Sequence, residues 1–138
     1  MAVRAVGIDL VSVRSFAEQL GSVGSAFADG TFTAGELRAA GGHSGAAQHL
    51  AARYAAKEAF VKAFSGARPG HAPVIPDMDW REVEVVRDGW GRPSIALHGA
   101  LAAAVRATLG PVVVHLSITH EPDMAAAVVI LEDPPAAR

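Results

Sequence analysis

The stretch LAARYAAKEAFVKAF, residues 50–64, constrains the fold of this chain more than any other. At about 100° per residue, its alanines at 52, 55, 56, 59 and 63 fall on one helix face, where small side chains let a neighbouring element approach closely. A second, bulkier apolar face is formed by Leu50, Tyr54, Val61 and Phe64. A helix that is apolar on most sides is usually buried, so we predict a central helix that begins near Ala46.

Four charged residues interrupt this apolar pattern. Glu58 and Lys62 lie one turn apart in the favourable order, and such a pair contributes only about 0.3–0.5 kcal/mol when exposed. Arg53 and Lys57 have the same spacing but like charge, which is unfavourable by a similar amount unless an anion lies beside them. Two interpretations follow. The charges form a solvated stripe with lysine stems along the helix, or they supply a carboxylate for a metal ion and cations for phosphates.

The composition excludes several classes of protein. A chain of 138 residues fits one domain, which we place at residues 1–132, with residues 133–138 as a disordered tail. A formal net charge of −2 argues against nonspecific nucleic-acid binding, and the absence of cysteine is compatible with a reducing cytosol. The longest apolar run, MAAAVVIL, is too short to span a membrane. We expect a soluble cytoplasmic protein with no nucleic-acid or membrane partner.

Asp9 lies in an otherwise apolar segment. Residues 3–10 read as a short buried strand, in which Gly7 indicates the close approach of another backbone or a ligand. Asp9 is a poor strand former beside isoleucine and leucine. Ser12 is a candidate N-cap for a first helix that stops at Gly21. Asp9 is therefore either a turn or cap residue or a functional carboxylate.

The rest of the chain predicts alternating helices, strands and loops. The capping-box spacing of Thr33 and Glu36 predicts a short helix over 34–40. The glycine- and proline-rich stretch from Ser65 to Asp79 should be irregular, and is a place for a lid over a ligand. Strands are predicted at 82–86, 94–97, 112–119 and 124–131, and a helix at 100–109. The chain lacks GxSxG, Walker, CxxC and GxGxxG motifs, which disfavours the enzyme classes that they mark.

Three segments, in chain order, carry a resemblance to a known family: GIDL at 7–10, RYAAKEAFVKAF at 53–64 and HLSITH at 115–120. They resemble the holo-acyl-carrier-protein synthases, the short 4′-phosphopantetheinyl transferases of fatty acid synthesis. FTAGEL at 32–37 and WGRPSIALHG at 90–99 are similar to the intermediate blocks of that family, so the resemblance covers nearly the whole chain. The combination of GID with KEAxxK makes it specific.

The resemblance implies which residues carry the chemistry. Asp9 and Glu58 would hold Mg²⁺ and, with Lys62, form the catalytic group; two carboxylates with phosphate oxygens and water are a normal arrangement for this ion. Lys62 is placed to meet a phosphate near the metal. The phosphate donor would be coenzyme A, and a serine hydroxyl of apo-acyl carrier protein would attack it. Two routes stay open for the proton of that serine, because Glu58 can take it directly or through a water molecule.

Further positions are implied to contact the two substrates. Ser65 and Gly66, expected just after the central helix, would bind coenzyme A through backbone amides, although the run here is less glycine-rich than the family's. Arg53 and His120 would contribute to the same binding site. Carrier proteins of this family present an acidic surface while this chain is itself net acidic. Recognition therefore requires a local basic patch, for which Arg14 is the candidate.

The predicted fold class is α+β, with one antiparallel sheet, formed by the strands near residues 3, 82, 94, 112 and 124, packed against the central helix. The resemblance implies a homotrimer with active sites at subunit boundaries. Two other functions remain as alternatives. One is a non-catalytic module that binds coenzyme A or a nucleotide, expected to have lost Asp9, Glu58 or Lys62. The other is a Mg²⁺-dependent pyrophosphate hydrolase, expected to carry more metal carboxylates.

Overall fold

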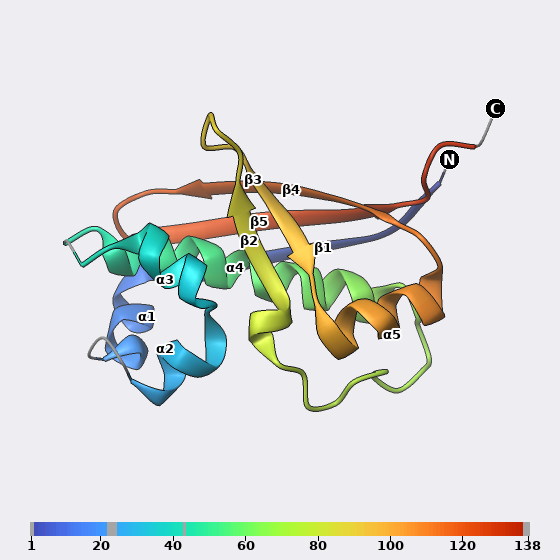
Figure 1. The fold of residues 1–138 in the computed structure, drawn as a ribbon, viewed down its shortest axis with the longest axis horizontal. Coiled ribbons are helices and arrows are strands. Elements are labelled where there is room, and N and C mark those ends of the chain that lie inside the picture. The colour runs from blue at the N-terminus through green and yellow to red at the C-terminus, as the bar shows by residue number, and fades with distance from the viewer. Residues whose placement is uncertain (1, 22–24, 43, 137–138) are drawn as a thin grey trace.

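The computed structural model describes residues 2–21, 25–42 and 44–136. In chain order its elements are β1 (Val3–Ser12), α1 (Val13–Leu20), α2 (Ala26–Thr31), α3 (Ala34–Ala40), α4 (Ala46–Gly66), the 3₁₀ helix η1 (Trp80–Glu82), β2 (Val83–Arg87), β3 (Pro93–Leu97), α5 (Gly99–Leu109), β4 (Val113–His120) and β5 (Met124–Glu132). Figure 1 shows α4 running along the molecule, with α1, α2 and α3 gathered near one end and α5 near the other. The combination of helices with antiparallel strands confirms the α+β class. No helix in the described ranges is both long and apolar enough to cross a bilayer.

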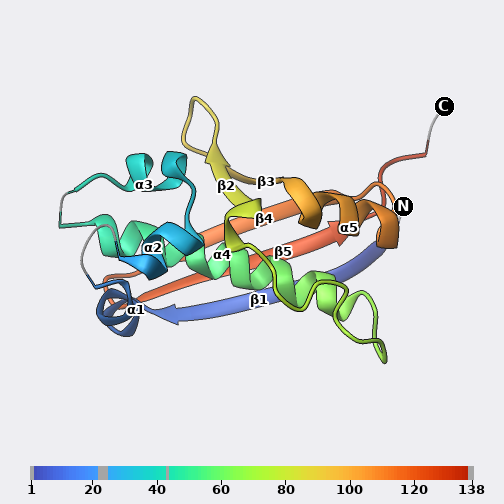
Figure 2. The same cartoon turned by 60° about the horizontal axis from the view of Figure 1, so that its bottom comes forward.

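Strands β1, β5 and β4 form a three-stranded antiparallel sheet in that order. Asp9 of β1 lies opposite Ala127 of β5, and β4 pairs with the other side of β5. Strands β1 and β4 are therefore the two edges of this sheet, as Figure 2 shows. Alternate residues of β5, at 125, 127, 129 and 131, are buried, and both β1 and β5 contact α4. The long helix thus covers one face of the sheet.

The β2–β3 hairpin forms a separate two-stranded sheet, so the prediction of a single five-stranded sheet is wrong. β3 lies beside β4 but does not pair with it. Side chains attach the hairpin to the helices instead. The Glu36 carboxylate accepts a hydrogen bond from the Val85 N–H at 2.9 Å, and Lys57 donates to the Val83 carbonyl. These long-range bonds hold the hairpin against α3 and α4. The sequence pattern that predicts a hairpin depends on neighbouring residues only, so it does not predict these bonds.

A fully buried ion pair joins α3 to α4. The Lys57 ammonium, whose side chain has no exposed surface, lies 2.8 Å from Glu36 Oε1. It also donates to the carbonyls of Trp80 and Val83. Burial lowers the pKa of the Lys57 amine, while the charge of Glu36 acts in the opposite direction. Glu36 is therefore the anion that compensates Lys57, and the interpretation of Lys57 as part of a solvated stripe is wrong.

Local signals predict several element boundaries correctly. The Ser12 side chain caps α1, which ends at Gly21. Thr33 and Glu36 form the predicted capping box at the start of α3. The central helix begins at Ala46, as expected.

Two features depart from the expected boundaries. The short helix α2 has no counterpart in the prediction. Helix α4 continues through Ser65 and Gly66, which the sequence places after the helix. A single glycine costs a helix only about 1 kcal/mol relative to alanine, and the buried residues 63–64 anchor the last turn more strongly than that.

Candidate functional site

Gly7 brings β1 and α4 into backbone contact. A Cβ atom at this position would lie 1.9 Å from the Ala59 carbonyl oxygen and 2.7 Å from the Ala63 nitrogen, which real side chains cannot approach so closely. Both alanines are fully buried. Glycine on the strand and alanine on the helix therefore permit this approach, as the sequence predicts. Because Asp9 follows Gly7 by two residues, the same contact fixes Asp9 beside α4.

Asp9, Glu58 and Lys62 line one cleft of about 340 Å³, which also has walls from α1. The Lys62 ammonium lies 2.9 Å from Asp9 Oδ1 and 3.2 Å from the carbonyl oxygen of Ile8. The hydrogen bond to Asp9, together with the charge of that carboxylate, raises the pKa of the Lys62 amine. Within the described ranges, the helix pair of Glu58 with Lys62 does not form an ion pair, and Lys62 bridges to β1 instead.

Tyr54 is a member of this cleft that sequence reasoning missed. The sequence pattern places Tyr54 on the apolar face of the helix, but its side chain lines the cleft beside Glu58, one turn later. Burial raises the pKa of Tyr54 to about 12, with further contributions from the neighbouring Glu58 carboxylate and from the charge of Asp9. The phenol thus keeps its proton at neutral pH. The signal that identifies it is a phenol four residues before a carboxylate on one helix.

The two carboxylates suit a divalent cation that takes its remaining ligands from elsewhere. Asp9 and Glu58 are half-buried and come from different elements. In the part of the chain that the structure describes, no cluster of three or more acidic or histidine side chains could hold a metal. Mg²⁺ commonly binds through one or two carboxylates plus phosphate oxygens and waters. The donor set therefore fits a cation held jointly with a phosphorylated substrate.

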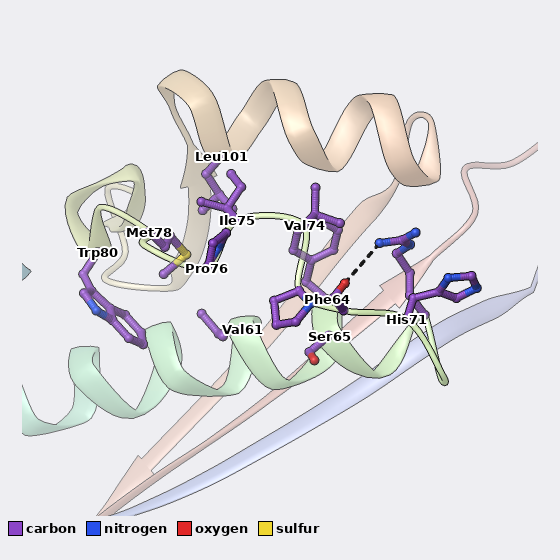
Figure 3. Close-up of a pocket in the computed structure, with 13 residues that line it drawn as sticks. Val61, Phe64, Ser65, His71, Val74, Ile75, Pro76, Met78, Trp80 and Leu101 are labelled. Atoms are coloured by element: carbon purple, nitrogen blue, oxygen red, sulfur yellow. Dashed lines mark hydrogen bonds between the residues drawn. The ribbon is translucent and has the colours of Figure 1, made fainter.

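Ser65 lies in the last turn of α4 and belongs to the wall of a second cavity, of about 240 Å³. Figure 3 shows this cavity between α4, α5 and the irregular segment 67–79. Its walls are mainly apolar: Val61, Phe64, Val74, Ile75, Met78 and Leu101. Because Ser65 and Gly66 are helical, their N–H groups point back along the helix. The predicted position of Ser65 and Gly66 after the helix is therefore wrong, while their contact to a ligand stays a prediction.

Arg53 and His120 lie away from the carboxylate cleft. Arg53 is about 140° around α4 from Glu58, and it lines a different cleft together with Arg87 of β2. Burial and then the charge of Arg87 lower the pKa of Arg53. His120 ends β4, at the sheet edge opposite to the strand that carries Asp9. A single chain thus does not bring Arg53 or His120 to the cleft.

The fold and the motifs define a family. The chain matches the family model described as the 4′-phosphopantetheinyl transferase superfamily over residues 5–125, and it belongs to this superfamily. A relative, the holo-[acyl-carrier-protein] synthase of Mycobacterium tuberculosis (strain H37Rv), is 53% identical over 135 residues, which cover 97% of this chain and 100% of the relative. The holo-[acyl-carrier-protein] synthase of Mycobacterium sp. (strain KMS) is 51% identical with the same coverage.

Solved structures agree with this assignment. The Chronobacterium ammoniagenes ACPS–CoA complex superimposes with a TM-score of 0.88 at 43% sequence identity, covering 98% of this chain and 100% of that one. The Mycobacterium tuberculosis acyl carrier protein synthase gives a TM-score of 0.76 at 50% identity, covering 96% and 100% respectively. The similarity therefore extends over the whole fold, including the strand and helix that carry the carboxylate cleft.

Proposed function

We propose that this chain transfers the 4′-phosphopantetheine group of coenzyme A to a serine of apo-acyl carrier protein, giving holo-acyl carrier protein and adenosine 3′,5′-bisphosphate. The observation that carries the proposal is the single cleft lined by Asp9, Glu58 and Lys62, in a chain related over nearly its full length to holo-[acyl-carrier-protein] synthases. The serine oxygen forms a bond to the phosphorus that bears the pantetheine arm. The bond from that phosphorus to the bridging pyrophosphate oxygen breaks, and the serine proton passes to Glu58 either directly or through a water molecule.

Asp9 and Glu58 are the residues that would hold Mg²⁺. The ion would neutralise the pyrophosphate of coenzyme A, which is the main demand of phosphoryl transfer. The protein contributes two carboxylates whose parent elements are locked together by the contact at Gly7. Two metal carboxylates rather than three or more also favour a transferase over the pyrophosphate hydrolase alternative. The presence of both, with Lys62, disfavours a non-catalytic module.

Lys62 supplies a mobile positive charge to the same cleft. Its side chain is 55% exposed and its ammonium is held by Asp9. Lysine is a flexible point charge, so the side chain can turn from Asp9 to a phosphate oxygen without any movement of α4. We assign it to the phosphates of coenzyme A, where it stabilises the charge that develops on the leaving group.

The apolar cavity beside Ser65 suits the pantetheine arm. Ser65 follows Lys62 by three residues, so this wall of the cavity lies one helical turn from the wall of the carboxylate cleft. Its walls come from α4, α5 and the segment 67–79 (Figure 3). An arm that leaves the reacting phosphorus in this direction would bury its methyl groups and methylenes against these side chains.

We also infer that the active unit is a homotrimer with sites at subunit boundaries. The carboxylates and Arg53 lie on different sides of α4, and His120 lies at the far edge of the sheet, so a second copy is needed to bring all of them to one ligand. Part of the sheet also offers an apolar surface, since Val6, Ile8 and Leu10 are 58–66% exposed and such patches mark interfaces. Light scattering should give a mass of three times 14.2 kDa; a fully active monomer would contradict the trimer.

The acidic carrier protein would dock beside the cleft. Helix α1 supplies Ser15 and Gln19 to the cleft wall, and Arg14 in its first turn is 90% exposed. In the described ranges, its one ion pair within 4.0 Å is with Glu18 and is long, at 3.8 Å. Arg14 is thus available to meet an acidic partner near the reacting serine. Cytoplasmic location, without a nucleic-acid or membrane partner, stays a prediction that accompanies this function.

Intact-mass spectrometry tests the proposed reaction directly. Apo-acyl carrier protein incubated with coenzyme A, Mg²⁺ and this protein should gain the mass of one phosphopantetheine. The gain should vanish on chelation of the metal and with Asp9→Asn, provided that the variant remains folded. An unmodified carrier with intact coenzyme A would contradict transfer, and cleaved coenzyme A without a modified carrier would favour the hydrolase.

A further inference from the structure

Tyr54 is a polar residue of the carboxylate cleft to which the proposed reaction assigns no task. It lines the cleft together with Asp9, Glu58 and Lys62. Tyr54 and Glu58 are one helical turn apart, so their side chains lie on the same side of α4. The Glu58 carboxylate contributes to the raised pKa of the Tyr54 hydroxyl, so the two groups interact across this turn. Tyr54 therefore lies beside one of the two residues that would hold the metal.

Three aromatic rings from other elements hold the Tyr54 ring in place. The ring centroids of Phe16, Phe27 and Trp80 lie 5.5, 5.8 and 6.1 Å from that of Tyr54. These neighbours come from α1, α2 and η1. Aromatic contacts at such distances favour defined ring orientations. The packing therefore fixes the direction in which the Tyr54 hydroxyl points.

In the described part of the chain, no ion pair holds the Glu58 carboxylate in place. The Lys62 ammonium is bound to Asp9 at 2.9 Å, and in the ranges 2–21, 25–42 and 44–136 Glu58 has no ion pair within 4.0 Å. A glutamate that is only partly buried has several side-chain rotamers of similar energy. A donor anchored in the core removes most of that freedom before any ligand arrives.

We propose that Tyr54 is a positioning residue, whose core-anchored hydroxyl orients the Glu58 carboxylate toward the cleft so that Asp9 and Glu58 form a prearranged divalent-cation site. This inference rests on the proposed metal-dependent function and adds a residue to it. Partners that orient a metal ligand typically change metal affinity by 10–100-fold when removed. A tyrosine with only a packing role would not affect metal affinity.

Direct metal binding by Tyr54→Phe separates the two roles. The phenyl ring retains the packing against its three aromatic neighbours and loses only the hydroxyl. Binding of Mn²⁺ to the full chain, followed by electron paramagnetic resonance with and without coenzyme A, should weaken by about tenfold. Ser15→Ala is the matched control, because Ser15 also lines the cleft and also carries a hydroxyl group. This variant should leave the Mn²⁺ affinity unchanged. In a Glu58→Gln background, Tyr54→Phe should have no further effect.

Each other outcome is decisive. Equal Mn²⁺ affinity for the wild type and Tyr54→Phe would overturn the proposal, whether or not the melting temperature falls. An unchanged affinity with a raised Michaelis constant for the carrier protein would also overturn it and assign the hydroxyl to partner binding. Failure of the wild type to bind Mn²⁺ with coenzyme A present would remove the metal site itself. The mass gain of the carrier protein would then show whether transfer survives without it.

Discussion

Replacement of Lys57 by methionine should destabilise the fold far more than an average substitution. The Lys57 ammonium is fully buried and donates to Glu36 and to the carbonyls of Trp80 and Val83. Methionine preserves most of the side-chain volume but removes the cation and all three donors. The Glu36 carboxylate then remains buried with only the N–H groups of Thr33 and Val85 as partners.

The expected magnitude follows from the uncompensated charge. Removal of one partner from a buried ion pair costs about 3–5 kcal/mol. An unfolding entropy of about 2.1 cal/mol/K per residue gives about 0.29 kcal/mol/K for 138 residues. The melting temperature should therefore fall by about 10–17 °C. Replacing both Lys57 and Glu36 by apolar residues should cost less than the sum of the single changes, because no charge is left unpaired.

Glu36→Gln adds a test with a defined pH dependence. It leaves the Lys57 ammonium without the charge that opposes the effect of burial, so the pKa of Lys57 falls further below its ordinary value. The unfolded state then binds more protons than the folded state, and stability rises with pH up to the pKa of an unfolded lysine. The destabilisation relative to wild type should be smaller at roughly pH 9 than at roughly pH 6.

The assays for these variants are thermal unfolding and guanidinium unfolding, both followed by circular dichroism. Protomer concentration must be the same throughout, because association adds to apparent stability. A Lys57→Met variant within about 1 kcal/mol of the wild type would refute the reasoning. It would mean that water or a rearranged side chain reaches Glu36 at little cost.

Three further changes test other parts of the structure. Gly7→Ala should lower the free energy of unfolding by about 1–3 kcal/mol or more, because the added Cβ would meet the helix backbone. Gly89 has open space around it, so Gly89→Ala should be as stable as the wild type. Equal losses for the two variants in thermal unfolding would contradict the contact at Gly7. The Thr33 hydroxyl is the main cause that lowers the pKa of Glu84, so Glu84 adds stability above its unfolded pKa that is lost as pH falls through the folded one. Glu84→Gln should flatten the acid side of a stability–pH curve, and an unaltered curve would count against this. Arg14→Glu should raise the Michaelis constant for the carrier protein in steady-state assays and leave that for coenzyme A unchanged, and similar effects on both would rule out a docking role.

Local chemistry made several parts of the fold predictable from the sequence. The capping box of Thr33 and Glu36 and the cap at Ser12 depend on neighbours three residues away, and both are present. Gly7 and Asp9 are conspicuous because neither is a common strand residue, and the structure places both against α4. The prediction that their strand is short and buried is wrong, because β1 has 10 residues and, Gly7 apart, is not buried in the single chain.

Contacts between distant residues were beyond such reasoning. Glu36 fills its capping role with one carboxylate oxygen, but that oxygen also binds Lys57, 21 residues later, and the other oxygen binds the Val85 N–H, 49 residues later. No spacing rule links these positions. The division into two sheets also depends on such contacts, because Glu36 and Lys57 form hydrogen bonds to the hairpin and hold it against the helices. Lys62 forms its ion pair with Asp9 and not with Glu58, and this likewise depends on how closely β1 approaches α4.

The contact at Gly7 also determines the order in which parts of the molecule can open. No layer of side chains separates β1 from α4 at Gly7. The same strand is also hydrogen-bonded along its length to β5. Separating strand from helix must therefore disrupt the sheet and the packing of α4 together, which makes it a global event. The segment 67–79 has few backbone hydrogen bonds, so we expect it to open at lower free energy than the sheet and α4. The carboxylate cleft should consequently persist in partly opened molecules that have already lost the cavity that we assign to the pantetheine arm, so that the proposed metal site outlasts the proposed arm site as the protein unfolds.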